Sequence, residues 1–379
     1  MDNIVNKTSQ RFALTGGNVI DGTGAPPRRS ALIISGDRIE SIGGDASGCP
    51  AVDVSGCTLL PGFIHAHAHP GFKQMEGADM PRYDEAYLEG CLAAGITTVR
   101  DMGALDATPF PEIRAQRDCL NASGKYPRIV SAGKFIAAPG GYGGIAPIAV
   151  TSKAEAADAI SRLAEAGADF VKTSLENGFT PDTTLPKLAP ELLAAICDAA
   201  RERGLRVAAH MSQSEPLRTL VQAGITDAGH APYDPMDDAL IELMVKRNII
   251  MAPTLTLFRM LSEKYGAPFL DTALDNVRRF VKAGGRVAVG DDYIEPESPW
   301  YGPGLPYGEL ELLAQAGLTN MQVIIALTAN GAEACGLKRE TGALLPGMRA
   351  DVVAVRGDPL KSLARLKDVR LVVLGGRIV

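Results

Sequence analysis

The segment PGFIHAHAHP, residues 61–70, holds three of the five histidines of the chain, His65, His67 and His69. It continues an apolar run from Thr58 to Ile64 that has the character of a buried strand. Residues two apart in a strand point to the same side, so the three imidazoles are predicted to share one face. Neutral imidazoles that converge at the end of a strand suit a borderline-soft divalent metal such as zinc. We therefore predict that a metal site begins here.

Composition limits the class of protein. The chain has 379 residues, 46% apolar and 22% charged, which is enough for one large domain and a smaller one. A net charge of -6 and a pI near 5.5 argue against a nucleic-acid partner. The six cysteines are scattered without a CxxC pair, which favours a reducing compartment. The polar residues 1–10 lack the apolar core of a signal peptide, and no run approaches the ~20 apolar residues of a membrane helix.

These limits predict a cytoplasmic protein that acts on a small-molecule substrate. Neither nucleic acid nor a membrane is expected as a partner, and assembly into a homo-oligomer is left open.

The two ends of the chain share a β character. Residues 12–60 consist of short β-type runs broken by Gly, Asp and Pro, with no helical period. The segment from Gly342 onward, GALLPGMRADVVAVRGD and then DVRLVVLGGRIV, reads in the same way. We therefore predict that residues 1–60 and 342–379 form one composite β-sandwich domain.

Between these ends, residues 61–341 alternate between strands and helices. Predicted helices such as 84–94, 153–166 and 190–203 separate apolar runs, and Gly often closes the helix. Eight such units predict an α/β fold, a (β/α)8 TIM-like barrel. A doubly wound open sheet is the alternative. It is disfavoured because no Gly-rich phosphate fingerprint opens the first helix and polar residues recur at the strand ends.

The chemistry of a (β/α)8 barrel lies at the C-terminal ends of its strands. The polar residues predicted there are His67, His69, Arg100, Asp101, Lys172, His210, His230, Asp291 and Asp292. A single histidine at such a place is usually a satisfied core residue. All five histidines at one end of the barrel indicate a functional site.

Lys172, in FVKTS, is predicted to end a buried strand, where a charged ammonium is costly to desolvate. An ion pair with Asp169 or Glu176 is one explanation. The other is a lysine of lowered pKa that has reacted with carbon dioxide, giving a carbamate that bridges two metal ions.

With these motifs in place, the chain resembles the amidohydrolase superfamily, metal-dependent hydrolases built on a distorted (β/α)8 barrel. The resemblance includes the C-terminal signature ALTANGAEACGL followed by GALLPGMRADVVAV. The GADFVK and TTVRDMG segments are most similar to those of prolidase-like metallopeptidases and related carboxylated-lysine enzymes.

The resemblance implies two divalent ions, expected to be zinc, and assigns their ligands. His67, His69 and Asp292 would bind the first ion, His210 and His230 the second, and carboxylated Lys172 would bridge the two. The family pattern at the eighth strand is Gly, then Thr or Ser, then Asp. It matches Gly290, Asp291 and Asp292, and so makes Asp292 the functional acid.

Two positions depart from the family pattern. His65 stands where Asp or Asn is common, and it is either a hydrogen-bond donor behind the ligands or a competitor for metal. Tyr142, in PGGYG, stands where related peptidases often carry histidine, and tyrosine is a poor base at neutral pH. Tyr142 and Arg100 are candidates for holding the oxyanion or a substrate carboxylate. For Arg100, an ion pair with Asp101 or another barrel acid is the alternative.

These assignments predict hydrolysis of an amide bond in a dipeptide or an N-acyl amino acid. Metal-bound hydroxide would attack, and Asp292 would transfer its proton to the leaving amine. Hydrolysis of a lactone, carbamate or cyclic amide is the alternative within the superfamily. A deaminase is less favoured, because mononuclear deaminases do not usually need the position of Lys172. A catalytically silent scaffold is disfavoured by the complete set of ligands.

Overall fold

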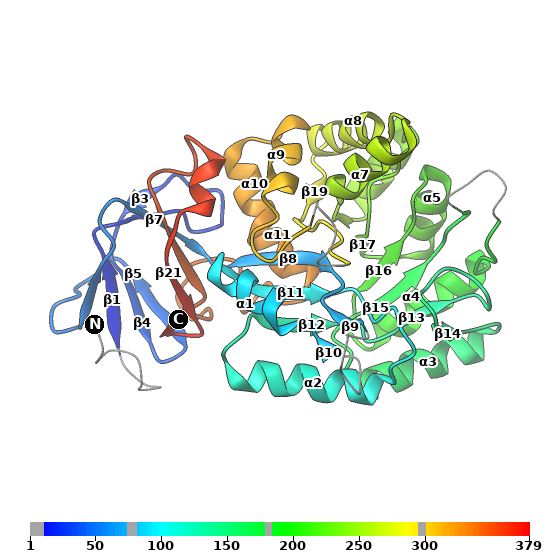
Figure 1. The fold of residues 1–379 in the computed structure, drawn as a ribbon, viewed down its shortest axis with the longest axis horizontal. Helices are drawn as coiled ribbons and strands as arrows, with labels where there is room; N and C mark the ends of the chain where they lie inside the picture. Colours follow the sequence, from blue (N-terminus) through cyan, green and yellow to red (C-terminus); the bar gives the residue numbers. More distant parts are fainter. Residues whose placement is uncertain (1–10, 74–81, 179–183, 295–300) are drawn as a thin grey trace.

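The computed structural model describes residues 11–73, 82–178, 184–294 and 301–379 (Figure 1). The polar segment 1–10, in which the sequence showed no signal peptide, lies outside the described residues. Within the described parts of the chain, no helix has the length and apolar character needed to cross a membrane.

The first sheet is built from the N-terminal segment alone and has the strand order β5-β4-β1-β6. Its strands are β1 (Phe12–Thr15), β4 (Leu32–Ser35), β5 (Arg38–Ile42) and β6 (Ala51–Asp53). The second sheet combines both ends of the chain in the order β22-β21-β20-β7-β2-β3. Its strands are β2 (Asn18–Val19), β3 (Arg28–Arg29), β7 (Cys57–Pro61), β20 (Val352–Arg356), β21 (Val369–Leu374) and β22 (Arg377–Ile378).

Strand β7 ties the two ends of the chain together. It pairs antiparallel with β20, with Leu60 opposite Val353. Alternate residues of both sheets, among them Leu14, Leu59 and Val352, are buried in one shared apolar cluster. Burying this face stabilises the pair of sheets, because each sheet alone would expose its apolar side to water.

The central strands run parallel and carry the site. They are β8 (Phe63–Ala68), β11 (Ile96–Asp101), β12 (Arg128–Ser131), β13 (Phe135–Ala137), β14 (Ile148–Ala149), β15 (Val171–Ser174), β16 (Val207–His210), β17 (Asp227–Ala228), β18 (Ile250–Met251) and β19 (Arg286–Val287). Hydrogen-bond ladders order them as β12-β11-β8 and β14-β13-β15-β16-β17-β18-β19. A separate two-stranded sheet pairs β9 (Gly71–Lys73) with β10 (Arg82–Tyr83).

Hydrogen bonds at two seams join the two ladders into a ring. The amide of Asp169, just before β15, donates to the carbonyl of Ser131 in β12. At the other seam the amide of Ala66 in β8 donates to the carbonyl of Val289, which follows β19. The ring of parallel strands is that of a TIM-like barrel, as predicted, and the alternative of an open sheet is wrong because both edges are joined.

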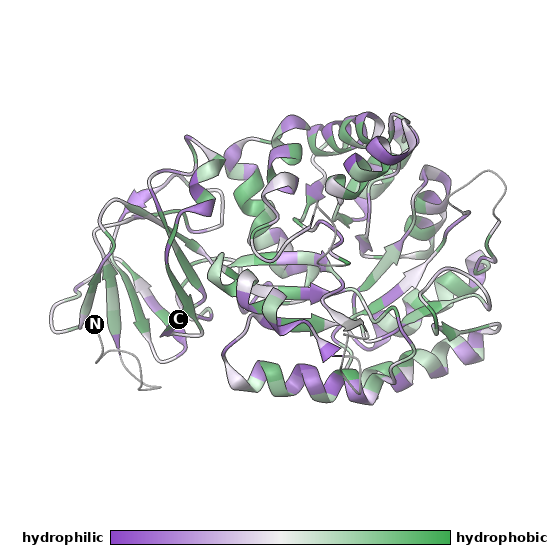
Figure 2. Ribbon diagram, viewed as in Figure 1, coloured by the Kyte–Doolittle hydropathy of each residue, from purple (hydrophilic) through white to green (hydrophobic). Residues whose placement is uncertain are grey.

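Helices surround the barrel (Figure 1). They are α1 (Glu85–Ala93), α2 (Phe110–Ser123), α3 (Lys153–Glu165), α4 (Pro190–Glu202), α5 (Ser214–Ala223), α6 (Asp238–Lys246), α7 (Leu255–Tyr265), α8 (Phe269–Lys282), α9 (Tyr307–Gln315), α10 (Asn320–Leu327) and α11 (Ala329–Ala334), with a 3-10 turn η1 (Leu363–Lys367) near the C-terminus. Figure 2 shows them banded with hydrophobic and hydrophilic residues. The apolar band faces the strands, as an amphipathic helix packed on a sheet requires.

Local signals explain where these helices start and stop. Ser152 accepts a hydrogen bond from the amide of Glu155 and so caps α3. Thr319 and Gln322 form a reciprocal capping box at the start of α10. Gly224 ends α5 at a φ of 107°, a conformation that costs a residue with a Cβ far more than it costs glycine.

Gly290 allows the chain after β19 to lie directly against β8. A Cβ on Gly290 would lie 2.6 Å from the backbone nitrogen of His67. We expect Gly290→Ala to lower the free energy of unfolding by about 1–3 kcal/mol, because the added methyl group overpacks this contact. Urea denaturation measures the change. Gly302→Ala is the matched control, since nothing lies within 4 Å of a Cβ there, and an equal loss in both variants would contradict the prediction.

Candidate metal centre

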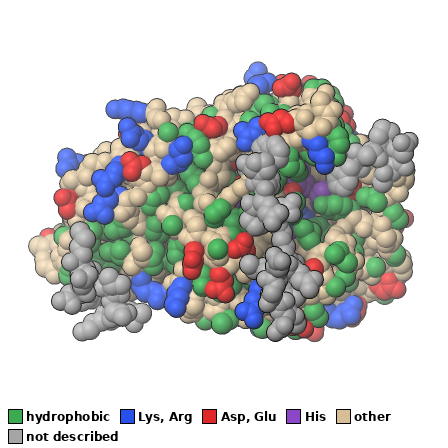
Figure 3. Space-filling model, in the orientation of Figure 1, with side chains coloured by type: hydrophobic (Ala, Val, Ile, Leu, Met, Phe, Trp, Pro, Cys, Tyr) green, Lys and Arg blue, Asp and Glu red, His purple; other side chains and the backbone are tan. Residues whose placement is uncertain are grey.

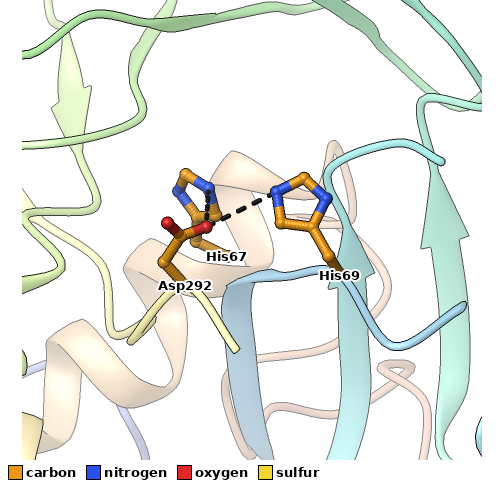
Figure 4. A group of neighbouring side chains, drawn as sticks. All are labelled: His67, His69 and Asp292. Carbon is orange, nitrogen blue, oxygen red and sulfur yellow. Dashed lines mark ion pairs between the residues drawn. The ribbon is translucent and has the colours of Figure 1, made fainter. Parts of the chain in front are cut away.

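His67 of β8 and His69, which directly follows β8, meet one carboxylate from the other side of the barrel seam (Figure 4). The Nε2 atoms of His67 and His69 lie 3.1 Å and 3.4 Å from Oδ1 of Asp292. All three side chains are buried. His67 lies in β8 and His69 directly after it, at the spacing of two that the sequence showed, and Asp292 comes from the loop after β19.

The donor atoms of this group suit a divalent ion. Both ring nitrogens of His67 are buried without a hydrogen bond, although Nε2 lies close to Asp292. Burial lowers the pKa of His67 to about 3, so the ring is neutral at pH 7 and Nε2 can offer a lone pair. Two donors on one tetrahedral zinc ion stand roughly 3.3 Å apart, given zinc–ligand bonds near 2.0–2.2 Å. The observed spacings of 3.1 Å and 3.4 Å match this separation.

His210 and His230 form a second pair. His210 Nδ1 lies 2.9 Å from His230 Nε2. The other nitrogen of each ring is held from behind: His210 Nε2 contacts Oε2 of Glu176 at 3.1 Å, and His230 Nδ1 contacts Oγ1 of Thr254 at 2.8 Å. His69 is held in the same way, through Nδ1 and the carbonyl of Gly103 at 2.8 Å. Each of these rings therefore has one anchored nitrogen and one directed inward.

The carboxylate of Glu176 fixes the tautomer of His210. Burial alone would raise the pKa of Glu176, but the hydrogen bond from His210 lowers it. An ionised carboxylate only accepts, so His210 Nε2 carries the proton and Nδ1 carries the lone pair. A proton on His230 Nε2 joins the two rings in the metal-free protein. In the other neutral tautomer the proton is on Nδ1, where Thr254 Oγ1 can accept it, and two lone pairs then lie 2.9 Å apart, which suits a shared cation.

The two groups adjoin. The ring centroids of His67 and His230 are 4.8 Å apart, and those of His210 and His230 are 4.7 Å apart. Histidine side chains are visible in a hollow of the space-filling view (Figure 3). Four imidazoles and one carboxylate thus form one buried cluster that opens to this hollow.

Lys172 joins the cluster from β15. A Cβ on Gly229 would lie 3.2 Å from both Lys172 Nζ and His67 Cε1, so the two side chains meet across this glycine. Burial lowers the pKa of Lys172 to about 7. The acids that the sequence offered as ion-pair partners are engaged elsewhere: Asp169 binds Arg117 at 2.7 Å and Glu176 binds His210. No carboxylate of the described residues forms an ion pair with Lys172.

Asp292 is held in a strained backbone conformation. Its φ is 61°, which is uncommon for a residue other than glycine, and such positions cost about 1–3 kcal/mol. Asp291 supports it, because Oδ1 of Asp291 accepts from the amide of Tyr293 at 3.1 Å and from Nε2 of His65 at 3.0 Å. The first bond spans Asp292 and the second ties the turn to β8. His65 therefore contacts Asp291 rather than the ligand group.

Glu176 and Thr254 were not predicted as parts of the site. Glu176 was considered only as a partner of Lys172, and Thr254 lies between β18 and α7, where nothing had been assigned. Glu176 lies two residues after β15 and Thr254 three residues after β18, and this position beyond a strand end is the signal that could have identified them. Their partners on other strands could not be read from the sequence.

Tyr142 and Arg100 have different surroundings. The ring of Tyr142 stacks on His210, with centroids 3.8 Å apart. Burial raises the pKa of Tyr142, so its hydroxyl keeps its proton at neutral pH. Arg100 pairs with Asp227 at 3.4 Å and lies over the ring of Phe170. The contact with Asp227 is an ion pair with a barrel acid, the alternative that the sequence offered for Arg100.

Comparison with known proteins gives four results. The sequence matches the amidohydrolase family over residues 58–379. Ochratoxinase of Aspergillus niger is 25% identical, and the match covers 94% of this chain and 83% of that protein. A Xaa-Pro dipeptidase solved with methionine in its active site has a TM-score of 0.83 at 24% identity, covering 98% of this chain and all of that one. The solved A. niger ochratoxinase has a TM-score of 0.82 at 23% identity, over 98% and 96%.

The two hydrogen bonds that Asp291 accepts beside Asp292 lead to a stability prediction. Asp291→Ala leaves the amide of Tyr293 and Nε2 of His65 buried without an acceptor, which we expect to cost about 2–4 kcal/mol. Asp291→Asn retains Oδ1 as an acceptor for both donors, and we expect a loss of about 1 kcal/mol. Urea unfolding of the metal-free protein measures both. Equal losses would show that the two hydrogen bonds do not hold the turn.

Proposed function

The chain belongs to the amidohydrolase family, and on that premise we propose that it hydrolyses the amide bond of a small substrate, such as a dipeptide or an N-acyl amino acid, with two bound divalent ions. The observation that carries this proposal is the convergence of four imidazoles and Asp292 in one buried cluster. The names of two relatives, a dipeptidase and ochratoxinase, agree with a hydrolytic role.

The ligands divide into two sets. His67, His69 and Asp292 would hold one ion, and the inward nitrogens of His210 and His230 would hold the other. When bound, the ions lower the pKa of water toward ~7 and polarise the carbonyl group of the substrate. Zinc suits this mixture of imidazole and carboxylate donors.

Asp292 is the group that moves the proton. The rings of His67 and His69 hold its pKa well below the usual range of a carboxyl group, although burial alone would raise it. Asp292 is therefore an anion at neutral pH. Its carboxylate takes the proton of the attacking water and passes it to the leaving amine, which is general acid–base work.

Tyr142 is positioned to bind the substrate. Its protonated hydroxyl is a hydrogen-bond donor, and its ring is fixed by the stacking on His210. We propose that it donates to the developing oxyanion or to a substrate carboxylate. A donor aimed at an oxyanion stabilises the transition state more than the ground state.

Lys172 would bridge the two ions after carboxylation. At pH 7 its pKa of about 7 leaves near half of the side chains as neutral amines. The amine attacks carbon dioxide, a nitrogen–carbon bond forms and one proton is released, so that an anion replaces the buried cation. The carbamate has two oxygens, and the neighbouring ions stabilise its negative charge.

The β strands at the two ends of the chain would form a domain separate from the barrel that carries the site. We propose that residues 1–60 and 342–379 form a β-sandwich domain and that residues 61–341 form the catalytic barrel. The pairing of β7 with β20 and the shared apolar cluster support this division.

A substrate screen tests the function. We expect the zinc-loaded protein to hydrolyse members of a library of dipeptides and N-acyl amino acids, measured by release of the free amine. Lactones, carbamates and cyclic amides form the comparison set. Turnover confined to that set, or no turnover of any amide, would contradict the proposal.

A comparison of Asp292 with Asp291 gives a second test. We expect Asp292→Asn to reduce kcat by about 10²–10⁴-fold, because the amide cannot carry the proton. Asp291→Asn should reduce it far less, since Asp291 supports the turn. Steady-state kinetics on the best amide substrate compare the two variants, and the reverse ranking would show that the acids are assigned the wrong way round.

Removing Lys172 tests the bridge. We expect Lys172→Ala to lose bound zinc and activity, and short carboxylic acids added from solution to restore part of both. Lys172→Arg should not be rescued, because the guanidinium keeps its charge and fills the space. Carbon-13 NMR after incubation with labelled bicarbonate detects the carbamate directly. An unmodified lysine in fully loaded, active protein would rule out the carbamate.

A further inference from the structure

A buried carboxylate outside the metal centre lies where two helices begin. Glu309 belongs to the first turn of α9 and is fully buried. Its Oε1 accepts from the amide of Leu255 at 2.9 Å, and its Oε2 accepts from the amide and the hydroxyl of Thr256 at 2.8 Å and 2.9 Å. Leu255 and Thr256 are the first two residues of α7. Glu309 therefore satisfies amides at the start of another helix.

That position is normally filled by the N-cap residue itself. An N-cap threonine usually accepts a hydrogen bond from an amide of the first turn through its own hydroxyl. The N-cap of α7 is Thr254, and its side chain makes no such bond. Its Oγ1 contacts His230 Nδ1 at 2.8 Å instead. Glu309 therefore caps the start of α7, while the hydroxyl of Thr254 contacts His230 instead of an amide of its own helix.

The backbone at Thr254 agrees with this exchange. Its φ is 51°, an outlier for a β-branched residue, and the side chain is fully buried. A conformation of this kind persists only when the surroundings hold it. The hydrogen bonds from Leu255 and Thr256 to Glu309 hold the segment on one side, and the bond to His230 holds it on the other.

We propose that Glu309 is a positioning residue for the metal centre: by capping α7 in place of Thr254, it frees the Thr254 hydroxyl to orient His230. The inference rests on the proposed function for the metal-binding role of His230. Hydrogen-bond partners behind a metal-binding histidine commonly change metal affinity by 10–100-fold. Glu309 acts on the ion only through Thr254 and His230. The change in metal affinity is therefore expected at the His210–His230 pair and not at the group around Asp292.

Stepwise zinc binding tests the proposal. The metal-free protein is titrated with Zn²⁺ by calorimetry at pH 8, where Glu309, whose pKa burial raises to about 7, is ionised. We expect Glu309→Gln to weaken one binding step about 10-fold or more and to leave the other within twofold. Glu311→Gln, an exposed change on the same helix, is the matched control. Equal weakening of both steps, or of neither, would overturn the proposal.

A double-mutant cycle tests whether Glu309 acts through Thr254. Thr254→Val removes the hydroxyl, and Thr254→Ser retains it. We expect Thr254→Val to weaken the same step as Glu309→Gln, Thr254→Ser to be close to the parent protein, and the double variant to be no weaker than Thr254→Val alone. Additive losses would contradict the proposed route. If Glu309→Gln does not fold, Glu309→Asp, which draws the charge back by one methylene, takes its place.

A measurement without metal separates this inference from the proposed function. The chain has five histidines, so their ring nitrogens give few signals in long-range proton–nitrogen NMR. We expect one tautomer of His230 in the parent protein and a mixture in Glu309→Gln. An unchanged His230 signal would overturn the positioning role even if two ions bind. A parent protein that binds only one ion would contradict the two-ion centre, while the NMR comparison would still decide the role of Glu309.

Discussion

The contact of Asp292 with His67 and His69 is the interaction on which the rest of the structure depends. It joins the first strand of the barrel to the chain after the last, and so lies at the seam where the ring closes. A buried carboxylate needs compensation, and here two imidazoles supply part of it. The arrangement requires a glycine at Gly290 for close approach and a strained turn at Asp292. The site and the closure of the fold therefore share the same few residues.

A hydrogen bond that holds one ring nitrogen is common to His69, His210 and His230. Gly103, Glu176 and Thr254 each hold one ring nitrogen and leave the other directed into the cluster. Fixing the tautomer in this way reduces the reorganisation needed when a cation binds. Lys172 is the exception, because it is buried beside the cluster without an ion pair to any acid of the described residues. Its lowered pKa and the neutral rings have the same physical cause, the removal of water.

Short-range periodicity predicted the barrel and the strand ends, and the family resemblance then assigned the candidate ligands. Spacing two placed His67 and His69 on one face, and the alternation of strands and helices located the strand ends. Such local patterns do not predict contacts between segments that are far apart in the sequence. The pairing of Arg100 with Asp227 depends on how two separate strands face each other inside the barrel. The capping of α7 by Glu309 likewise depends on the packing of two helices, and no local motif marks it.

The central claim is that one cluster holds two ions on separate sets of ligands. Anomalous diffraction at the zinc edge from crystals of the zinc-loaded protein tests it most directly. The account predicts two peaks, one in contact with His67, His69 and Asp292, the other with His210 Nδ1 and His230 Nε2. A single peak at full occupancy, or peaks away from these atoms, would contradict it.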